Sequence, residues 1–112
     1  MEKSFIPDNQ IAWMPASGNT FRKVTGYNDQ LMMVKVKFLQ GSVGAVHEHP
    51  HSQASFVASG KFEVQIKDEK KVLEAGDCFF AAPNVPHGVV CLEEGVVVDV
   101  FSPMRQDFVS KE

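Results

Sequence analysis

All four histidines of the 112-residue chain lie in two short segments, and imidazole is the commonest metal ligand among side chains. His47, His49 and His51 alternate with other residues in the first segment, and His87 lies in the second. Residues two apart on an extended strand project from the same face, so His47 and His49 could offer two ligands to one ion. Scattered surface or core histidines are the alternative, but clustering beside Gly and Pro turn residues argues against them. The first hypothesis is therefore a metal centre.

A second set of chemically active residues lies in the run 96–108. Asp99 interrupts an apolar, strand-like stretch, where an unpaired carboxylate is costly, so we expect it to face a wet cavity, a cation or a substrate. Phe101 shares its face, and Arg105 follows the strand end within reach of a barrel mouth. The structural alternative is an ion pair between Asp99 and Arg105, with Phe101 as ordinary core.

Strand patterns must position these residues, because helix signals are weak throughout the chain. Val34, Val36 and Phe38 alternate with lysines, which is the period of a half-buried strand. Similar patterns predict strands at 34–38, 54–59, 61–67, 72–74, 78–81, 87–92 and 96–102, with a turn through 67–71. Many short strands separated by Gly and Pro turns indicate an antiparallel sandwich or barrel.

Composition limits the possible classes of protein. At 112 residues and 44% hydrophobic, residues 1–112 are expected to form one domain that buries roughly two thirds of its unfolded surface. A net charge of -3 without a basic block disfavours a nucleic-acid partner. No apolar run approaches the ~18 residues of a membrane helix, and the N-terminus lacks an apolar signal core. We therefore expect a soluble, cytoplasmic protein with no membrane partner.

The two cysteines and the N-terminal segment give weaker signals. Cys78 and Cys91 lie in apolar runs and are interpreted as small buried residues, although Cys91 shares strand parity with His87 and could lie near the site. Residues 1–20 are the least regular part of the chain. Their apolar side chains must cover apolar surface somewhere, and a second copy in a homodimer is one possible place: Phe5, Ile6, Trp13 and Met14.

The spacing of the histidine segments resembles the two motifs of the cupin family. The first motif is matched by Gly41, His47, His49, Gln53 and Gly60, and the second by Gly76-Asp77, Pro83, Pro86 and His87. This resemblance implies an all-β cupin double-stranded β-helix, or jelly-roll barrel. Three positions depart from the family pattern: Gln53 replaces the usual glutamate, Asn84 a glycine and Cys91 an asparagine.

The cupin resemblance also implies that His47, His49, Gln53 and His87 hold one divalent metal ion: nickel, zinc, manganese or iron. Because Gln is neutral, such a centre is one unit more positive than a Glu version, which favours an anionic substrate and Lewis-acid chemistry over oxygen chemistry. The alternative for Gln53 is packing or hydrogen bonding beside the metal. His51 is expected beside the ligand set, because Pro50 alters the local path.

Asp99, Phe101 and Arg105, together with the three-His, one-Gln set, resemble a narrower group, the pectin- and alginate-degradation cupins of the KdgF type. The resemblance runs from about Gly41 to Phe108. It implies an enzyme that converts a small anionic sugar, a 4,5-unsaturated monouronate, to its linear keto form. Asp99 would be the general acid/base, Arg105 would bind the substrate carboxylate, and Phe101 would wall one ring face. A metal-dependent dioxygenase and a non-catalytic sugar-binding cupin are the alternatives.

Overall fold

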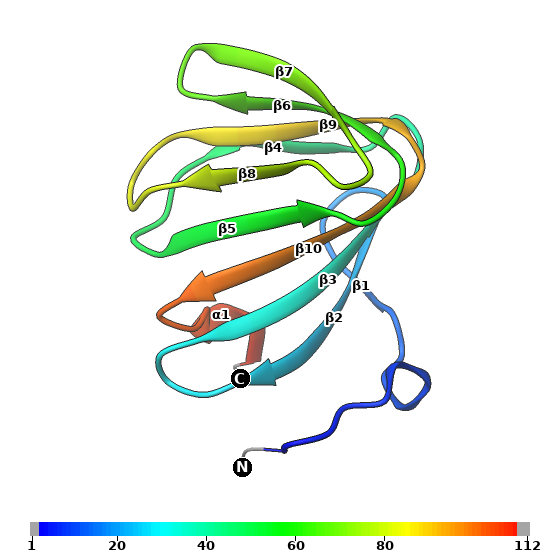
Figure 1. Ribbon diagram of the computed structural model, residues 1–112, viewed down its shortest axis with the longest axis vertical. Helices are drawn as coiled ribbons and strands as arrows, with labels where there is room; N and C mark the ends of the chain where they lie inside the picture. The colour runs from blue at the N-terminus through cyan, green and yellow to red at the C-terminus, as the bar shows by residue number, and fades with distance from the viewer. Residues whose placement is uncertain (1–2, 110–112) are drawn as a thin grey trace.

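The computed structural model describes residues 3–109, and most of their regular structure is β-strand. Antiparallel strands form two sheets that face each other, and the core lies between them (Figure 1). This is the all-β jelly-roll fold that the sequence predicts. No helix of the described residues is long and apolar enough to cross a membrane.

The larger sheet has six strands among residues 3–109. In spatial order they are β1 (Met14–Pro15), β2 (Thr20–Tyr27), β3 (Met32–Phe38), β10 (Gly95–Ser102), β5 (Ser52–Val57) and β8 (Cys78–Ala81). The four-stranded sheet has the order β4 (Val43–His47), β9 (His87–Glu93), β6 (Lys61–Ile66) and β7 (Glu69–Glu74). A 3-10 helix, η1 (Asp8–Gln10), precedes β1, and a short helix, α1 (Gln106–Val109), follows β10. Since the chain passes repeatedly between the sheets, residues far apart in sequence meet in the space that the sheets enclose.

Two buried apolar clusters hold the sheets together. The first consists of Phe38, Val57, Phe62, Val64, Cys91 and Val97, and the second of Met32, Val34 and Phe101. Phe38 and Phe62 meet edge to face, with ring centroids 5.2 Å apart. Full burial of one such side chain contributes about 1.5–3 kcal/mol. The clusters therefore fix the spacing of the two sheets and leave room for polar side chains between them.

Each predicted strand is present within three residues of its predicted bounds, but the sequence analysis missed β2, β4 and the two-residue strand β1. Charged residues interrupt the apolar alternation of β2, and Gly44 weakens that of β4. The turn after β6 is also shorter than predicted, because β7 already begins at Glu69. Lys67, in this turn, has a φ of 55°, the left-handed conformation that tight hairpin turns require.

The prediction that Cys78 is buried is wrong. β8 is an edge strand on which Ala81 is fully buried and Phe79 half-buried, so the alternate residues Cys78 and Phe80 face outward and are exposed. Cys91, by contrast, is 1% exposed and belongs to the first apolar cluster, as predicted. An apolar run cannot tell which of its two faces will be buried, and this was the source of the error.

Ion pairs attach the N-terminal segment to the outside of the large sheet. Lys23 Nζ and Lys35 Nζ both donate to Asp8 Oδ1, at 3.1 and 2.8 Å, and Lys23 Nζ lies 4.8 Å from the centre of the Trp13 ring. Phe5 remains 88% exposed and Met14 56% exposed in this chain. The homodimer that would cover them stays a prediction.

Candidate metal centre and active site

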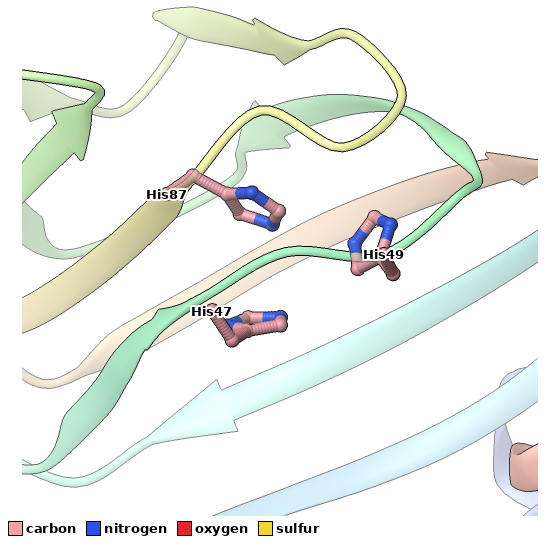
Figure 2. A group of neighbouring side chains, drawn as sticks. All are labelled: His47, His49 and His87. Carbon is pink, nitrogen blue, oxygen red and sulfur yellow. The ribbon is translucent and has the colours of Figure 1, made fainter.

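Three histidines converge between the sheets from two segments of the chain (Figure 2). His47 is the last residue of β4 and pairs in register with His87, the first residue of β9. His49 lies in the loop after β4, so the prediction that it shares a strand with His47 is wrong. The loop nevertheless brings its ring within 4.8 Å of the His87 ring, measured between centroids. One possible ligand nitrogen from each histidine lies within 4.8 Å of the other two.

Backbone carbonyls determine which ring nitrogen of each imidazole carries the hydrogen. Nδ1 of His47 contacts the carbonyl of Ala45 at 2.9 Å, and Nδ1 of His87 contacts that of Val85 at 2.9 Å. His49 Nδ1 lies 3.2 Å from the carbonyl of His51. A carbonyl can only accept, so each Nδ1 must carry the hydrogen, which leaves each Nε2 with a free lone pair. This is the orientation in which a histidine ligates a metal through Nε2.

Gln53 places a fourth possible ligand atom beside the histidines. Its side chain is buried on β5, and its Oε1 lies 3.1 Å from His49 Nε2 and 3.2 Å from His87 Nε2. Its Nε2 donates to Ser55 Oγ at 2.9 Å and to Asp99 Oδ1 at 3.3 Å, which orients the carbonyl oxygen toward the histidines. These contacts agree with both interpretations of Gln53, as a metal ligand and as a hydrogen-bonding neighbour of the histidines.

The ligand set fits a divalent cation. His49 Nε2 and His87 Nε2 both lie close to Gln53 Oε1. When Nδ1 of each ring carries the hydrogen, none of these three atoms has a hydrogen to donate, so their lone pairs repel. A cation among them would remove this repulsion between lone pairs. Burial also lowers the pKa of His49 and His87, which keeps both rings in the neutral form that binds metal.

Asp99 adjoins this ligand set from the neighbouring strand. It lies on β10, opposite Ser55 on β5, and its Oδ1 accepts hydrogen bonds from Ser55 Oγ at 2.6 Å and Gln53 Nε2 at 3.3 Å. Burial raises the pKa of Asp99 to about 6, while these hydrogen bonds and the positive charges of Arg105 and Arg22 act in the opposite direction. The structure thus places a carboxylate beside the candidate metal ligands, facing a cavity.

Arg105 does not form the structural ion pair with Asp99 that the sequence left open. Within residues 3–109 it pairs with Asp107, through Nε to Oδ1 at 3.1 Å and Nη2 to Oδ2 at 2.9 Å. Its guanidinium carbon lies 5.2 Å from the centre of the Phe101 ring and 4.4 Å from that of Phe108. Phe101 is 2% exposed; it packs in the second apolar cluster and also lines the cavity.

A cavity of about 370 Å³ joins these groups, which is large enough for a monosaccharide. It is lined by His47, Gln53, His87, Asp99, Phe101 and Arg105, among others. Its wall also includes Arg22 on β2, which the sequence analysis did not identify. Thr20, Arg22 and Val24 share one face of this strand, but the sequence does not show that this face lines the cavity.

His51 lies beside the candidate metal ligands, whereas Cys91 does not. His51 is half-buried, and its ring centroid is 5.2 Å from that of His49 and 6.4 Å from that of Phe101. Its carbonyl orients His49, which places it beside the ligand set. Cys91 points away, with its Sγ 3.1 Å from the carbonyl of Glu93.

Comparison with known proteins identifies the family of this chain. The cupin domain family matches residues 34–101. The pectin degradation protein KdgF of Dickeya dadantii (strain 3937) is 46% identical over 110 residues, which cover 96% of this chain and 99% of that protein. The chain belongs to the KdgF family of cupins. This assignment confirms the resemblance that the histidine motifs and the Asp99 to Arg105 segment suggest.

Solved structures resemble this KdgF-type cupin closely. An RmlC-like cupin from Shewanella frigidimarina superposes with a TM-score of 0.93 at 44% identity, covering 96% of both chains. KdgF from Halomonas sp. superposes with a TM-score of 0.92 at 38% identity, covering 96% of this chain and 99% of that one. The polyketide cyclase RemF from Streptomyces resistomycificus shares the fold, at 13% identity and a TM-score of 0.80, over 92% of this chain and 81% of its own.

Proposed function

We propose that this cupin takes part in pectin or alginate degradation by converting 4,5-unsaturated monouronates to their linear keto forms. The observation that carries the proposal is the position of Gln53, whose amide contacts two histidines with its oxygen and Asp99 with its nitrogen. One side chain therefore couples the candidate metal ligands to the only carboxylate that lines the cavity among the described residues. The name of the Dickeya relative supports the substrate class.

Asp99 is placed to move the proton that this reaction requires. In an unsaturated uronate, Asp99 removes the proton of the C1 hydroxyl, the C1 oxygen becomes a carbonyl, and the bond from C1 to the ring oxygen breaks. The electron pair passes to the ring oxygen and forms an enolate across C5 and C4. Asp99 returns the proton to C4, which leaves a ketone at C5, so the reaction is an isomerisation with no atom gained or lost.

Arg105 and Phe101 position the sugar in this proposal. Arg105 uses Nε and one hydrogen of Nη2 to bind Asp107, and Nη1 makes no hydrogen bond within residues 3–109. That unused edge would hold the uronate carboxylate in a two-point contact. Phe101 provides an apolar wall for one face of the ring.

His47, His49, Gln53 and His87 would hold the divalent ion that supports this chemistry. When bound, the ion would act as a Lewis acid that stabilises negative charge on substrate oxygens during the reaction. His47 is the ligand most exposed to the cavity, and it leaves that side of the ligand set accessible to the sugar.

The test is to mix the metal-loaded protein with a monouronate that a polysaccharide lyase has produced, and to follow the ultraviolet absorbance of its conjugated alkene. We expect the absorbance to disappear faster than in buffer, with no oxygen consumed on an oxygen electrode. Oxygen consumption would favour the dioxygenase alternative. Binding of the sugar with no loss of absorbance would favour a sugar-binding cupin.

A further inference from the structure

Arg22 places a second guanidinium on the wall of the cavity. It lies on β2, opposite Val36 of β3 in the register of the sheet, and it lines the same cavity as Asp99 and Arg105. β2 is remote in sequence from the other cavity-lining charges, which come from β10 and the segment after it. The fold therefore brings two arginines from opposite ends of the chain to one cavity.

The two guanidiniums differ in how they are neutralised. Arg105 donates two hydrogen bonds to the carboxylate of Asp107. Within residues 3–109, no oxygen accepts a hydrogen bond from the guanidinium of Arg22 and no carboxylate forms an ion pair with it. The guanidinium carbon lies 3.8 Å from the centre of the Phe108 ring. Stacking on a ring satisfies the face of a guanidinium but leaves all five of its N–H donors available at the edge.

A half-buried guanidinium that makes no direct contact with an anion is costly to keep in a protein. The charges of Asp107 and Asp99 act on Arg22, but neither carboxylate forms an ion pair with it. Burial is the main cause that lowers the pKa of Arg22. The cavity holds one carboxylate, Asp99, which already accepts hydrogen bonds from Ser55 and Gln53. The missing partner of Arg22 is therefore an anion that enters from solution, and a planar, two-oxygen anion best matches the guanidinium fork.

We propose that Arg22 is a further substrate-binding residue, which binds the carboxylate of the sugar acid and makes the site specific for uronates over neutral sugars. This inference rests on the proposed function for the identity of the sugar. Arg105 keeps its contact with the same carboxylate through the edge that Asp107 leaves free, and Phe108 contacts the guanidiniums of both arginines. Together they place two positive charges on the cavity wall of a net acidic chain, which favours an acidic sugar.

The test compares Arg22→Met, which keeps the apolar stem against Phe108, with Arg22→Lys, which keeps the charge but loses the fork. Lys70→Met is the matched control, because it removes one exposed positive charge from β7 on the other sheet. With the unsaturated monouronate, we expect Arg22→Met to raise KM about tenfold or more with a much smaller change in kcat. Arg22→Lys should give an intermediate KM, and Lys70→Met should match the wild type.

A binding measurement separates this inference from the proposed function. Calorimetry on the metal-loaded proteins compares saturated galacturonate with galactose, neither of which can undergo the reaction. The wild type should prefer galacturonate, and Arg22→Met should lose that preference, even if the wild type turns over no unsaturated uronate. A wild-type KM and galacturonate affinity in Arg22→Met would overturn the inference, as would a fall in kcat alone. If Arg22→Met does not fold, an unchanged KM in Arg22→Lys overturns it.

Discussion

Gln53 occupies a position where either an amide or a carboxylate could serve as a metal ligand, but only an amide fits both of its contacts. Its oxygen faces His49 and His87, while its nitrogen donates a hydrogen bond to Asp99. A glutamate would present a second oxygen where the nitrogen now lies, 3.3 Å from Asp99 Oδ1. In the proposed function, glutamine therefore serves as a metal ligand and as the donor that holds the carboxylate of Asp99.

Replacing Gln53 with Glu separates these two roles. We expect Gln53→Glu to keep its divalent ion but to lower kcat by about tenfold or more, because Asp99 loses a donor and gains a neighbouring like charge. Metal content and steady-state kinetics measure the two effects. Ser55→Ala is the comparison variant, because it removes a hydrogen bond to Asp99 and an acceptor of Gln53 Nε2 but adds no charge, so kcat should fall less than in Gln53→Glu. An unchanged kcat in Gln53→Glu would show that the amide nitrogen has no role.

Asp99→Asn tests the proposed acid/base role of this single side chain. The substitution keeps the shape of the side chain but removes its ability to carry a proton, so kcat should fall by about 10² to 10⁴-fold. Metal content and Tm should stay near those of the wild type, because Asp99 contacts the ligand set only through Gln53. Near-normal turnover in this variant would refute the assignment.

Side-chain chemistry decided which site residues could be predicted from the sequence. The histidines were identifiable because they cluster in the sequence. Asp99 was identifiable because an unpaired carboxylate in an apolar strand is costly. Arg22 was missed because it lies beside Lys23 and other polar residues, a pattern typical of a solvent-exposed strand. Only the sheet register shows that Arg22 faces inward while Lys23 faces the N-terminal segment.

At the scale of elements, β10 is the strand on which the site depends, because it carries Asp99 and Phe101 and pairs with both β3 and β5. It begins at Gly95, where the backbone approaches the turn at Ser59 and Gly60 very closely. A Cβ at this position would collide with the Ser59 carbonyl and lie 2.6 Å from Gly60 Cα. The glycine is needed there for space.

We therefore expect Gly95→Ala to destabilise the fold by about 1–3 kcal/mol or more, since backbone atoms must move to admit the methyl group. Gly44→Ala is the control: a Cβ there meets Val89 O at 3.8 Å and Phe38 Cε2 at 3.9 Å, which are ordinary contacts. Thermal unfolding of both variants measures the difference. Equal Tm values for the two would contradict the proposed close approach of β10 to this turn.

The N-terminal segment gives a prediction that depends on pH. Hydrogen bonds from Lys35 and Lys23 lower the pKa of Asp8, so this carboxylate stabilises the folded state above its ordinary pKa, and the contribution disappears as pH falls through the lowered value. Asp8→Asn should lower Tm slightly at pH 7, because the side chain is exposed to solvent, and the difference should vanish in acid. Asp29→Asn, an exposed aspartate without these partners, should show no such difference. A gap that persists at acid pH would contradict the ion-pair explanation.

For strands, as for single residues, the sequence pattern does not show which face or edge the tertiary structure will bury. Alternating apolar residues made β3 and β6 recognisable, and their faces follow from burial of every second side chain. β8 was predicted as a strand, but as an edge strand it exposes Cys78, which its composition could not reveal. β4 lacks alternation and forms because β9 offers it a partner, which is a tertiary cause.

At the scale of the whole molecule, the candidate metal centre joins the two sheets. His47 and His87 belong to the four-stranded sheet and Gln53 to the six-stranded sheet, with His49 in the loop between β4 and β5. A bound ion would therefore link both halves of the sandwich between its two apolar clusters. Because the unfolded chain does not hold these residues together, the ion should stabilise the folded state by mass action.

Removing the ion should accordingly lower the stability of the entire domain. At a free metal concentration 100 times Kd, one site contributes about 2.7 kcal/mol, so a chelator should lower Tm by roughly 10 °C, and added metal should restore it. His49→Ala is the matched control, because a variant without that ligand should have a low Tm that the chelator does not change. Elemental analysis must show that the wild type has lost its ion. An unchanged Tm after that loss would mean that no metal links the two sheets.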